Sequence, residues 1–149
     1  MIDSVRARYE RLQIDRLLEQ YPGLRIIPSP DEDLILSGPV RFTATGPGGR
    51  EITDGYDIEL RIPPTFPDRA PLVRETADRI PHDYHKLTGD YLCLASPTRI
   101  RIELAQSPDI PAFVGQFVIP YLYGHSCHEQ HGTMPYGELA HGPEGIRED

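Results

Sequence analysis

The sequence predicts an α+β fold, in which helices flank an antiparallel sheet. The first sign is a helical stretch near the start of the chain, which Pro22-Gly23 ends. The second is a strict alternation of apolar and charged residues over 56–62, the period-2 pattern of a half-buried antiparallel strand. The third is a helical apolar pattern that begins near Asp109. We therefore expect a single domain over residues 1–149, with a Gly- and His-rich tail at 124–149.

Composition limits the classes of function. A net charge of −8 over 149 residues argues against a general nucleic-acid binder, whose affinity comes from neutralising phosphates. No stretch of about 18 apolar residues is present, so no membrane span is expected. Two cysteines do not make a disulfide framework, and the first residues lack an apolar signal region. We expect a reduced, cytoplasmic protein whose partners are proteins or peptides.

The first helix is expected to begin with Asp3 or Ser4 as its cap and to run to about Gln20. Its apolar residues do not form one stripe, because those of the first half face nearly opposite to those of the second half. The helix is therefore either covered on two sides or broken near its middle. The two groups are Val5, Tyr9 and Leu12, then Ile14, Leu18 and Tyr21.

Strands are expected between the helices, and the stretch 56–62 is the clearest of them. Pro63-Pro64 ends it, because proline cannot donate a hydrogen bond to the sheet. Gly46-Pro47-Gly48-Gly49 is a strong turn signal before it. The other expected strands are 24–27, 34–37, 40–45 and 72–76.

A later helix is expected from about Asp109, since Pro111 suits a first helical turn. Pro120 should kink or end this helix. No apolar period follows, so the residues from Gly124 onward are expected to be loop and tail. The apolar face of the helix comprises Phe113, Val114, Phe117 and Val118.

Cys93 is the strongest candidate for chemistry in the chain. It lies in Gly89-Asp90-Tyr91-Leu92-Cys93-Leu94, shortly after Pro81-His82-Asp83-Tyr84-His85. A free cysteine is most often a small buried hydrophobe, and the flanking leucines favour that interpretation. A nucleophilic cysteine needs exposure and a nearby base or positive charge, which the histidine-containing loop can supply. Both interpretations stay open on the residues alone.

The order of these segments resembles that of the ubiquitin-conjugating enzymes. In that family a strand leads into a proline-rich turn, a His-containing loop and a Gly-x-x-Cys-Leu segment whose cysteine carries a thioester. Here Phe66-Pro67-x-x-Ala70-Pro71 is similar to the family's Tyr-Pro-x-x-Pro-Pro turn, and Gly89 stands four residues before Cys93 rather than three. The best match is the stand-alone bacterial conjugating protein of short CBASS (cyclic-oligonucleotide antiphage) operons. This resemblance implies a ubiquitin-conjugating-like fold with an N-terminal helix, an antiparallel meander, an active-site loop and one further helix, without the usual last two helices.

The same resemblance implies a transferase that needs no cofactor and acts in antiphage defence. Cys93 would take a protein C-terminus, suspected to be that of the operon's cyclic-oligonucleotide synthase, as a thioester. It would then pass this C-terminus to a lysine of a target protein, with neither nucleic acid nor membrane as a partner. Two other classes stay open: a non-catalytic protein-binding module similar to RWD domains, and a cysteine hydrolase that releases the acyl group to water.

The resemblance also suggests partners for Cys93. The family places His-Pro-Asn before its cysteine, with the asparagine as oxyanion donor, but this chain contains no asparagine. With one inserted residue, His82 takes the histidine position and Tyr84 the asparagine position. Without the insertion, His85 takes the asparagine position. We prefer His85 as the functional histidine and His82 as a structural one.

Lysine is nearly absent, because Lys86 is the only lysine among the fifteen basic residues. Codon bias is one explanation. The other is that an enzyme carrying an activated carbonyl gains from few nearby amines, since arginine stays protonated and does not attack a thioester. Lys86 is then either a site of self-modification or a positive group that stabilises the Cys93 thiolate.

The last part of the chain holds two further candidate groups. Residues 125–131 contain Cys127, three histidines and a glutamate, but no second pair of metal ligands follows. We expect a solvated histidine-rich loop there rather than a metal site, with Cys127 as an alternative reactive thiol. The segment 134–142 resembles the C-terminal segment of the same bacterial proteins. It either brings Glu138 or His141 over Cys93 as active-site support or docks a partner.

Overall fold

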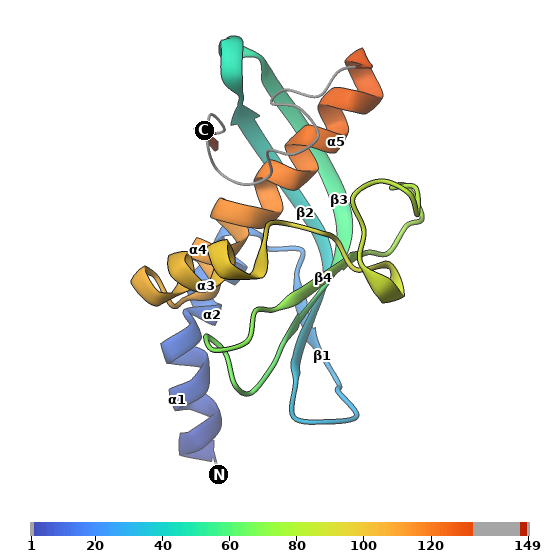
Figure 1. Cartoon of the computed structure of the whole chain (residues 1–149). Helices are drawn as coiled ribbons and strands as arrows, with labels where there is room; N and C mark the ends of the chain where they lie inside the picture. Colours follow the sequence, from blue (N-terminus) through green and yellow to red (C-terminus); the bar gives the residue numbers. More distant parts are fainter. Residues whose placement is uncertain (1, 133–146, 149) are drawn as a thin grey trace.

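A computed structural model describes residues 2–132 and 147–148 and has the predicted α+β class (Figure 1). An antiparallel sheet carries a helical layer on one face. The helices are α1 (Ile2–Leu12), α2 (Ile14–Gln20), α3 (Pro97–Gln106), α4 (Ile110–Phe113) and α5 (Ile119–His131). The strands are β1 (Arg25–Ile27), β2 (Leu34–Thr45), β3 (Glu51–Ile62), β4 (Leu72–Glu75) and β5 (Arg147–Glu148). Short turns are η1 (Pro47–Gly49), η2 (Thr88–Asp90) and the π-helical η3 (Val114–Val118).

The N-terminal helical segment is broken near its middle, which is one of the two predicted outcomes. Gln13 has a φ of 60° and separates α1 from α2. The break rotates the second helix so that apolar residues on both sides of it reach the core. Leu12, Ile14 and Leu17 are accordingly at most 1% exposed.

The sheet is a meander in which β1, β2, β3 and β4 lie in sequence order and each neighbouring pair is antiparallel. The segments 34–37 and 40–45 form one continuous strand rather than two, because Gly38 and Pro39 stay in register with Ile58 and Asp57. The even-numbered residues of β2 and β3 face the helices, as the period-2 pattern predicts. The two-residue β5 pairs with the end of β2.

The late helical region departs most from the sequence prediction. Asp109 caps α4 as expected, with its carboxylate accepting the N–H of Ala112 at 2.8 Å. Pro120 does not end the helix, and the loop expected from Gly124 onward is wrong for residues 124–131, because α5 continues to His131. Pro120 lies just after the π-helical turn, in which each bond spans five residues. That wider turn accommodates a residue that has no N–H and that crowds the preceding turn.

The prediction of one further helix after the Cys93 segment is also wrong, because α3 precedes α4 and α5. Ser96 caps α3 by accepting the N–H of Arg99 at 3.2 Å, and Pro97 occupies its first turn. Only Ile100 and Leu104 of this helix are buried, so its apolar signal is weak. Within the described residues, no helix combines the length and the apolar character needed to cross a membrane.

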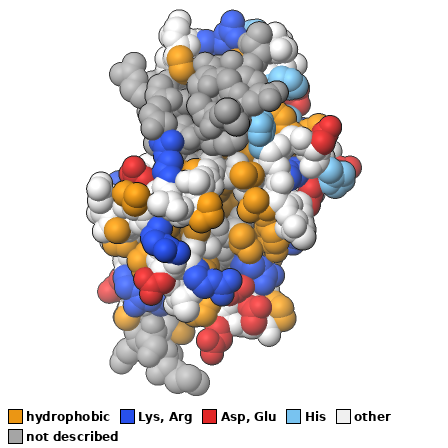
Figure 2. Space-filling model, viewed as in Figure 1, with side chains coloured by type: hydrophobic (Ala, Val, Ile, Leu, Met, Phe, Trp, Pro, Cys, Tyr) orange, Lys and Arg blue, Asp and Glu red, His pale blue; other side chains and the backbone are white. Residues whose placement is uncertain are grey.

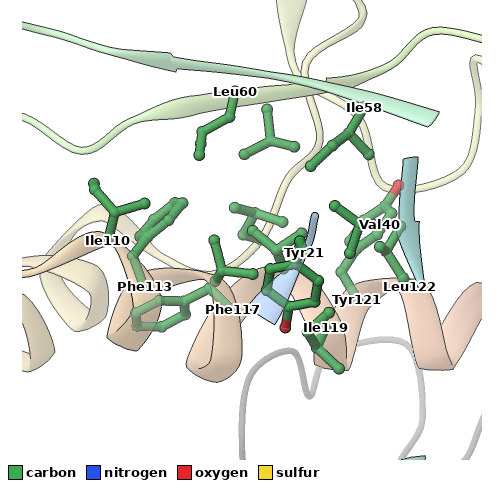
Figure 3. Close-up of a cluster of buried hydrophobic side chains, with 14 of the residues drawn as sticks. Tyr21, Val40, Ile58, Leu60, Ile110, Phe113, Phe117, Ile119, Tyr121 and Leu122 are labelled. Carbon is green, nitrogen blue, oxygen red and sulfur yellow. The ribbon is translucent and has the colours of Figure 1, made fainter. Parts of the chain in front are cut away.

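The core lies between the helix-facing side of β2 and β3 and the layer formed by α4, η3 and α5. Figure 3 shows Ile58 and Leu60 of β3 opposite Phe113 and Phe117. Both phenylalanines are fully buried, and their ring centroids lie 5.7 Å apart. Burying each large apolar side chain contributes about 1.5–3 kcal/mol to folding, so this layer holds the helices against the sheet. α5 is therefore a core helix, and the segments that pack on it are held in a fixed position.

Gly38 is required where β2 passes the end of the N-terminal helices. Its φ is 143°, and a Cβ at this position would overlap the carbonyl oxygen of Gly23. We expect Gly38→Ala to lower the free energy of unfolding by about 1–3 kcal/mol, because the backbone must move to relieve the overlap. Urea denaturation monitored by circular dichroism measures this change.

Gly48→Ala is the matched control for this prediction. Gly48 also has a positive φ, of 82°, but a Cβ added there, in the turn between β2 and β3, would have no atom within 4 Å. The free energy of unfolding of Gly48→Ala should fall only by the backbone strain of about 1 kcal/mol. Equal losses in the two variants would contradict the close-approach argument.

Candidate functional site

The loop between β4 and α3 contains Cys93 and begins at a buried carboxylate. Glu75 is 5% exposed, and its carboxylate accepts backbone N–H bonds from Ala77 at 2.5 Å, Arg79 at 2.7 Å and Ile80 at 2.7 Å. These donors satisfy a charge that would otherwise be costly to bury. The loop therefore leaves the sheet in one defined direction.

The loop then folds back so that Cys93 returns to its first half. Lys86 and Leu92 form an antiparallel bridge, and the N–H of Leu92 donates to the carbonyl of Val73 in β4 at 2.7 Å. The N–H of Cys93 donates to the carbonyl of His85, also at 2.7 Å. The predicted proximity of the histidine loop and Cys93 is thus present, and backbone hydrogen bonds hold it.

This loop also contains most of the strained backbone in the described residues. Asp78, His85 and Asp90 have positive φ values of 56°, 44° and 68°, and Gln13 is the only other described non-glycine residue of this kind. Each such residue destabilises the fold by about 1–3 kcal/mol, and such residues cluster at functional sites. The concentration of strain around Cys93 favours a functional role for this loop over a merely connecting one.

Cys93 is half-buried, while the adjacent Leu92 and Leu94 are buried. The two leucines therefore anchor the segment and leave the cysteine between them on its more exposed side. Tyr121 of α5 lies nearby. Burial raises the pKa of the Tyr121 phenol, and the negative charges that Tyr84 and Cys93 carry when ionised raise it further. A buried, protonated tyrosine thus stands beside the thiol.

Tyr84 and His85 connect Cys93 to α5. The hydroxyl of Tyr121 donates to the carbonyl of Tyr84 at 2.7 Å, and the ring of Tyr84 meets those of His85 and His125 edge-on, with centroids 4.7 and 5.0 Å apart. Tyr84 is therefore a half-buried packing residue at the centre of an aromatic cluster. His85 presents its carbonyl to Cys93 and its ring to Tyr84.

His82 and Lys86 both bind Asp90 and do not approach Cys93 through any hydrogen bond between described residues. His82 Nδ1 lies 2.7 Å from the Asp90 carboxylate, and the His82 side chain is 80% exposed. The Lys86 ammonium donates to Asp90 at 2.9 Å and to the carbonyl of Ile80 at 2.7 Å, and the Lys86 side chain is 2% exposed. In this conformation Lys86 is not accessible to self-modification. Its support of the site consists of shaping the loop.

Residues 125–131 were expected to form a solvated loop and instead form the last turns of α5. His125 and Cys127 are buried, whereas His128 and His131 are exposed, so helical geometry separates them. Among the described side chains, no group of His, Cys, Asp and Glu is arranged to hold a metal ion. Cys127 is 1% exposed and accepts a hydrogen bond from Arg50 at 3.5 Å. Glu138 and His141 lie outside the described residues.

Arg79 ties the loop to both β3 and α5. Its Nη1 and Nη2 donate to the two carboxylate oxygens of Asp54 at 3.2 and 2.7 Å, and Nη1 also donates to the carbonyl of Gly55. Its Nε and Nη2 donate to the carboxylate of Glu129 at 3.2 and 2.7 Å. The guanidinium also lies over the ring of Tyr56, 4.0 Å from the centroid. These bonds engage all five N–H groups of the arginine.

A buried chain of hydrogen bonds starts at Asp54 and ends at His125. The hydroxyl of Ser126 donates to Asp54 at 2.7 Å, and the hydroxyl of Tyr56 lies 2.7 Å from Ser126 Oγ and 2.8 Å from His125 Nδ1. Burial opposes ionisation of Asp54, but bonds from Arg79, Ser126 and the backbone keep its pKa below the usual value. Burial lowers the pKa of His125.

The histidine end of this chain borders a pocket of about 330 Å³ on the surface. The pocket lies between the C-terminal half of α5 and the loop that carries Cys93. Figure 2 shows histidine and acidic side chains close together along this side of the molecule. The pocket is lined by Arg79, Pro81, Asp83, Tyr84, His125, His128 and Glu129. We call it the Tyr84 pocket.

The sequence contains one signal for this hydrogen-bond chain. Tyr56 occupies an inward position of the alternating strand, and a buried tyrosine hydroxyl needs a polar partner. Its partners Ser126 and His125 lie in the stretch from Gly124 onward that was expected to be a loop. In a helix, Ser126 lies on the same face as Leu122, four residues earlier, and that face of α5 is buried.

Comparison of the chain with models of known protein families, with curated proteins and with solved structures finds no match.

We expect Arg79→Lys to lower the free energy of unfolding by about 1–3 kcal/mol, because one ammonium cannot reproduce hydrogen bonds in a planar fork. Arg74→Lys is the matched control. Like Arg79, Arg74 forms an ion pair and faces an aromatic ring, that of Tyr91, but among the described residues it pairs with one carboxylate only, that of Glu59 at 2.7 Å. Its side chain is 38% exposed, so this change should have an effect below about 1 kcal/mol. Urea denaturation measures the free energy of unfolding of both variants. A similar decrease in the two would contradict the role given to Arg79.

Proposed function

We propose that Cys93 accepts an acyl group as a thioester and transfers it to an amine, in the manner of the ubiquitin-conjugating enzymes. The observation that carries this proposal is the placement of the half-buried thiol. Cys93 is joined by its N–H to the carbonyl of His85 in a strained loop, and the hydroxyl of Tyr121 lies 3.4 Å from the same carbonyl. A nucleophilic cysteine requires partial exposure in a polar, fixed environment, whereas Cys127, the other cysteine, is buried.

The order of the elements supports the same proposal. Helical segments precede a four-stranded antiparallel meander, the loop with Cys93 follows β4, and α5 crosses the sheet behind it. This is the order that the resemblance to ubiquitin-conjugating enzymes implies, up to the helices that follow the loop.

The near absence of lysine supports thioester chemistry from another direction. A thioester is consumed by any unprotonated amine that reaches it. Lys86 is the only lysine of the chain, and its ammonium is buried and bound to Asp90 and Ile80. The arginines stay protonated and do not compete. An acyl group on Cys93 is therefore protected from the side-chain amines of the chain itself.

The partners follow from the resemblance and form part of the proposal. The acyl group is the C-terminus of a carrier protein, which we take to be a cyclic-oligonucleotide synthase encoded in the same operon. The acceptor is a lysine of a target protein, and the setting is antiphage defence in the bacterial cytoplasm. No cofactor is needed at Cys93 itself, because the thioester already holds the activated carbonyl.

Intact-protein mass spectrometry tests the proposal on wild type and Cys93→Ser, each co-expressed with the neighbouring operon proteins. We expect a hydroxylamine-sensitive adduct on wild type and a stable ester on Cys93→Ser, and the adduct mass identifies the carrier. An adduct that water alone removes, with no transfer to lysine, would indicate a hydrolase. The absence of any adduct, with the partners shown to be present, would sink the enzyme assignment and favour a non-catalytic RWD-like module.

The two loop histidines should differ in their effect on transfer. His85→Ala should slow discharge of the Cys93 thioester to lysine more than His82→Ala, because the His85 ring packs on Tyr84 in the segment bonded to Cys93, whereas the His82 side chain is mostly exposed beside Asp90. A loss of about tenfold or more is expected for His85→Ala. Single-turnover discharge followed by mass spectrometry measures both. The reverse ranking would favour the alignment with one inserted residue, in which His82 is the functional histidine.

A further inference from the structure

The direction of the hydrogen bonds between Asp54 and His125 fixes the tautomer of the buried histidine. Asp54 is ionised and can only accept, so the single hydroxyl proton of Ser126 points to it. Ser126 Oγ must then accept from Tyr56, which uses the one proton of the phenol. Tyr56 can therefore only accept from His125, and Nδ1 of His125 carries the proton.

The other ring nitrogen, Nε2, is consequently a lone-pair acceptor in neutral His125. Burial lowers the pKa of this residue, which keeps the ring neutral near pH 7. His125 is 3% exposed and lines the Tyr84 pocket, and no hydrogen-bond partner for Nε2 is found among the described residues. A neutral acceptor with one fixed tautomer, in a residue that lines a pocket and with no partner among the described residues, is suited to an N–H donor that comes from outside the protein.

The charges around the Tyr84 pocket favour a basic guest. Asp83 and Glu129 line it with carboxylates, and Asp54 lies behind it. Arg79 is the one arginine or lysine of the lining, and its N–H groups are already bound to Asp54, Gly55 and Glu129. The pocket thus offers no free arginine donor to an anion. The carboxylates of the lining and the lone pair of His125 suit an amine.

The pocket and Cys93 belong to one continuous piece of structure. Tyr84 lines the pocket, and the next residue, His85, supplies the carbonyl that binds the Cys93 N–H. Tyr121 donates to the carbonyl of Tyr84 and lies near Cys93. The hydroxyl of Tyr121 also lies 3.4 Å from the His85 carbonyl that binds the Cys93 N–H, so the wall of the pocket and Cys93 are fixed to the same two residues.

From this geometry we propose that the Tyr84 pocket is the site of the acceptor amine and that Nε2 of His125 takes up its proton. This inference rests on the proposed thioester function. The amine nitrogen bonds to the thioester carbonyl carbon and becomes acidic as it does so. The carbon–sulfur bond breaks, and the sulfur leaves with the electron pair. The amine proton passes to Nε2 of His125 and is returned from there to the Cys93 thiolate.

The binding part is tested on the full chain by nitrogen-15 NMR of the imidazole rings. We expect the spectrum of His125 to show the Nδ1–H tautomer. Titration with N-α-acetyl-lysine methylamide should shift Nε2, whereas N-α-acetyl-norleucine methylamide, which lacks only the amine, should not. Tyr56→Phe keeps the ring but removes the acceptor of Nδ1–H, so a mixture of tautomers should appear. Equal shifts from both probes, or an Nε2–H tautomer in the wild type, would overturn the proposal.

The chemical part uses Cys93 loaded by exchange with a peptide mercaptoethanesulfonate thioester, followed by discharge to N-α-acetyl-lysine methylamide. His125→Asn is the sharpest variant, because the asparagine N–H₂ can still donate to Tyr56 while the Nε2 acceptor is lost. Discharge should slow by about a hundredfold, the usual contribution of a positioned base, with loading unchanged. His131→Asn, an exposed histidine of α5 that does not line the pocket, is the control and should discharge like wild type. An unchanged rate in His125→Asn would overturn the role of Nε2.

The two arms separate the two proposals. A lysine-specific shift of Nε2 in a protein whose Cys93 takes no acyl group would uphold the amine site and reject the thioester function. Loading of Cys93 with no lysine-specific shift would uphold the thioester function and reject the amine site. Because the NMR titration uses wild-type protein, a variant that fails to fold does not remove the test.

Discussion

Arg79 is the constraint on which the geometry of the candidate site depends. Its guanidinium bonds to Asp54 in β3 and Glu129 in α5, and Arg79 itself belongs to the loop that carries Cys93. One rigid, planar donor group thus fixes three segments that are far apart in the sequence. The guanidinium also packs on the Tyr56 ring and so fixes the position of its hydroxyl. The hydrogen bonds that lead from Asp54 to His125 pass through this hydroxyl, so their geometry depends on Arg79.

A second constraint acts on the loop alone. The buried carboxylate of Glu75 gathers backbone N–H groups at the start of the loop, and the bridge between Lys86 and Leu92 closes it. Between these points the chain accepts left-handed conformations at Asp78 and His85. Such strain persists only where surrounding bonds over-determine the backbone. The loop is therefore rigid by construction, although it has little regular secondary structure.

The sequence predicts the sheet and the loop better than it predicts α5. The alternation over 56–62 suffices for β3, because a period of two has no helical interpretation. The position of Cys93 beside His85 follows from their short separation in the sequence. Pro120 misleads, because its effect depends on the π-helical turn before it, and no local pattern marks that turn. The pairing of Asp54, Arg79 and Ser126 joins distant segments and is set by tertiary packing alone.

The near absence of lysine has a practical consequence for handling the molecule. The single ε-amine, that of Lys86, is shielded by the fold, so an amine-specific label would react with the amino terminus and leave the body of the folded protein unmodified. Unfolding would expose Lys86 as a second position. The number of labels per chain would then count folded and unfolded molecules in one mass spectrum, without any probe introduced by mutation.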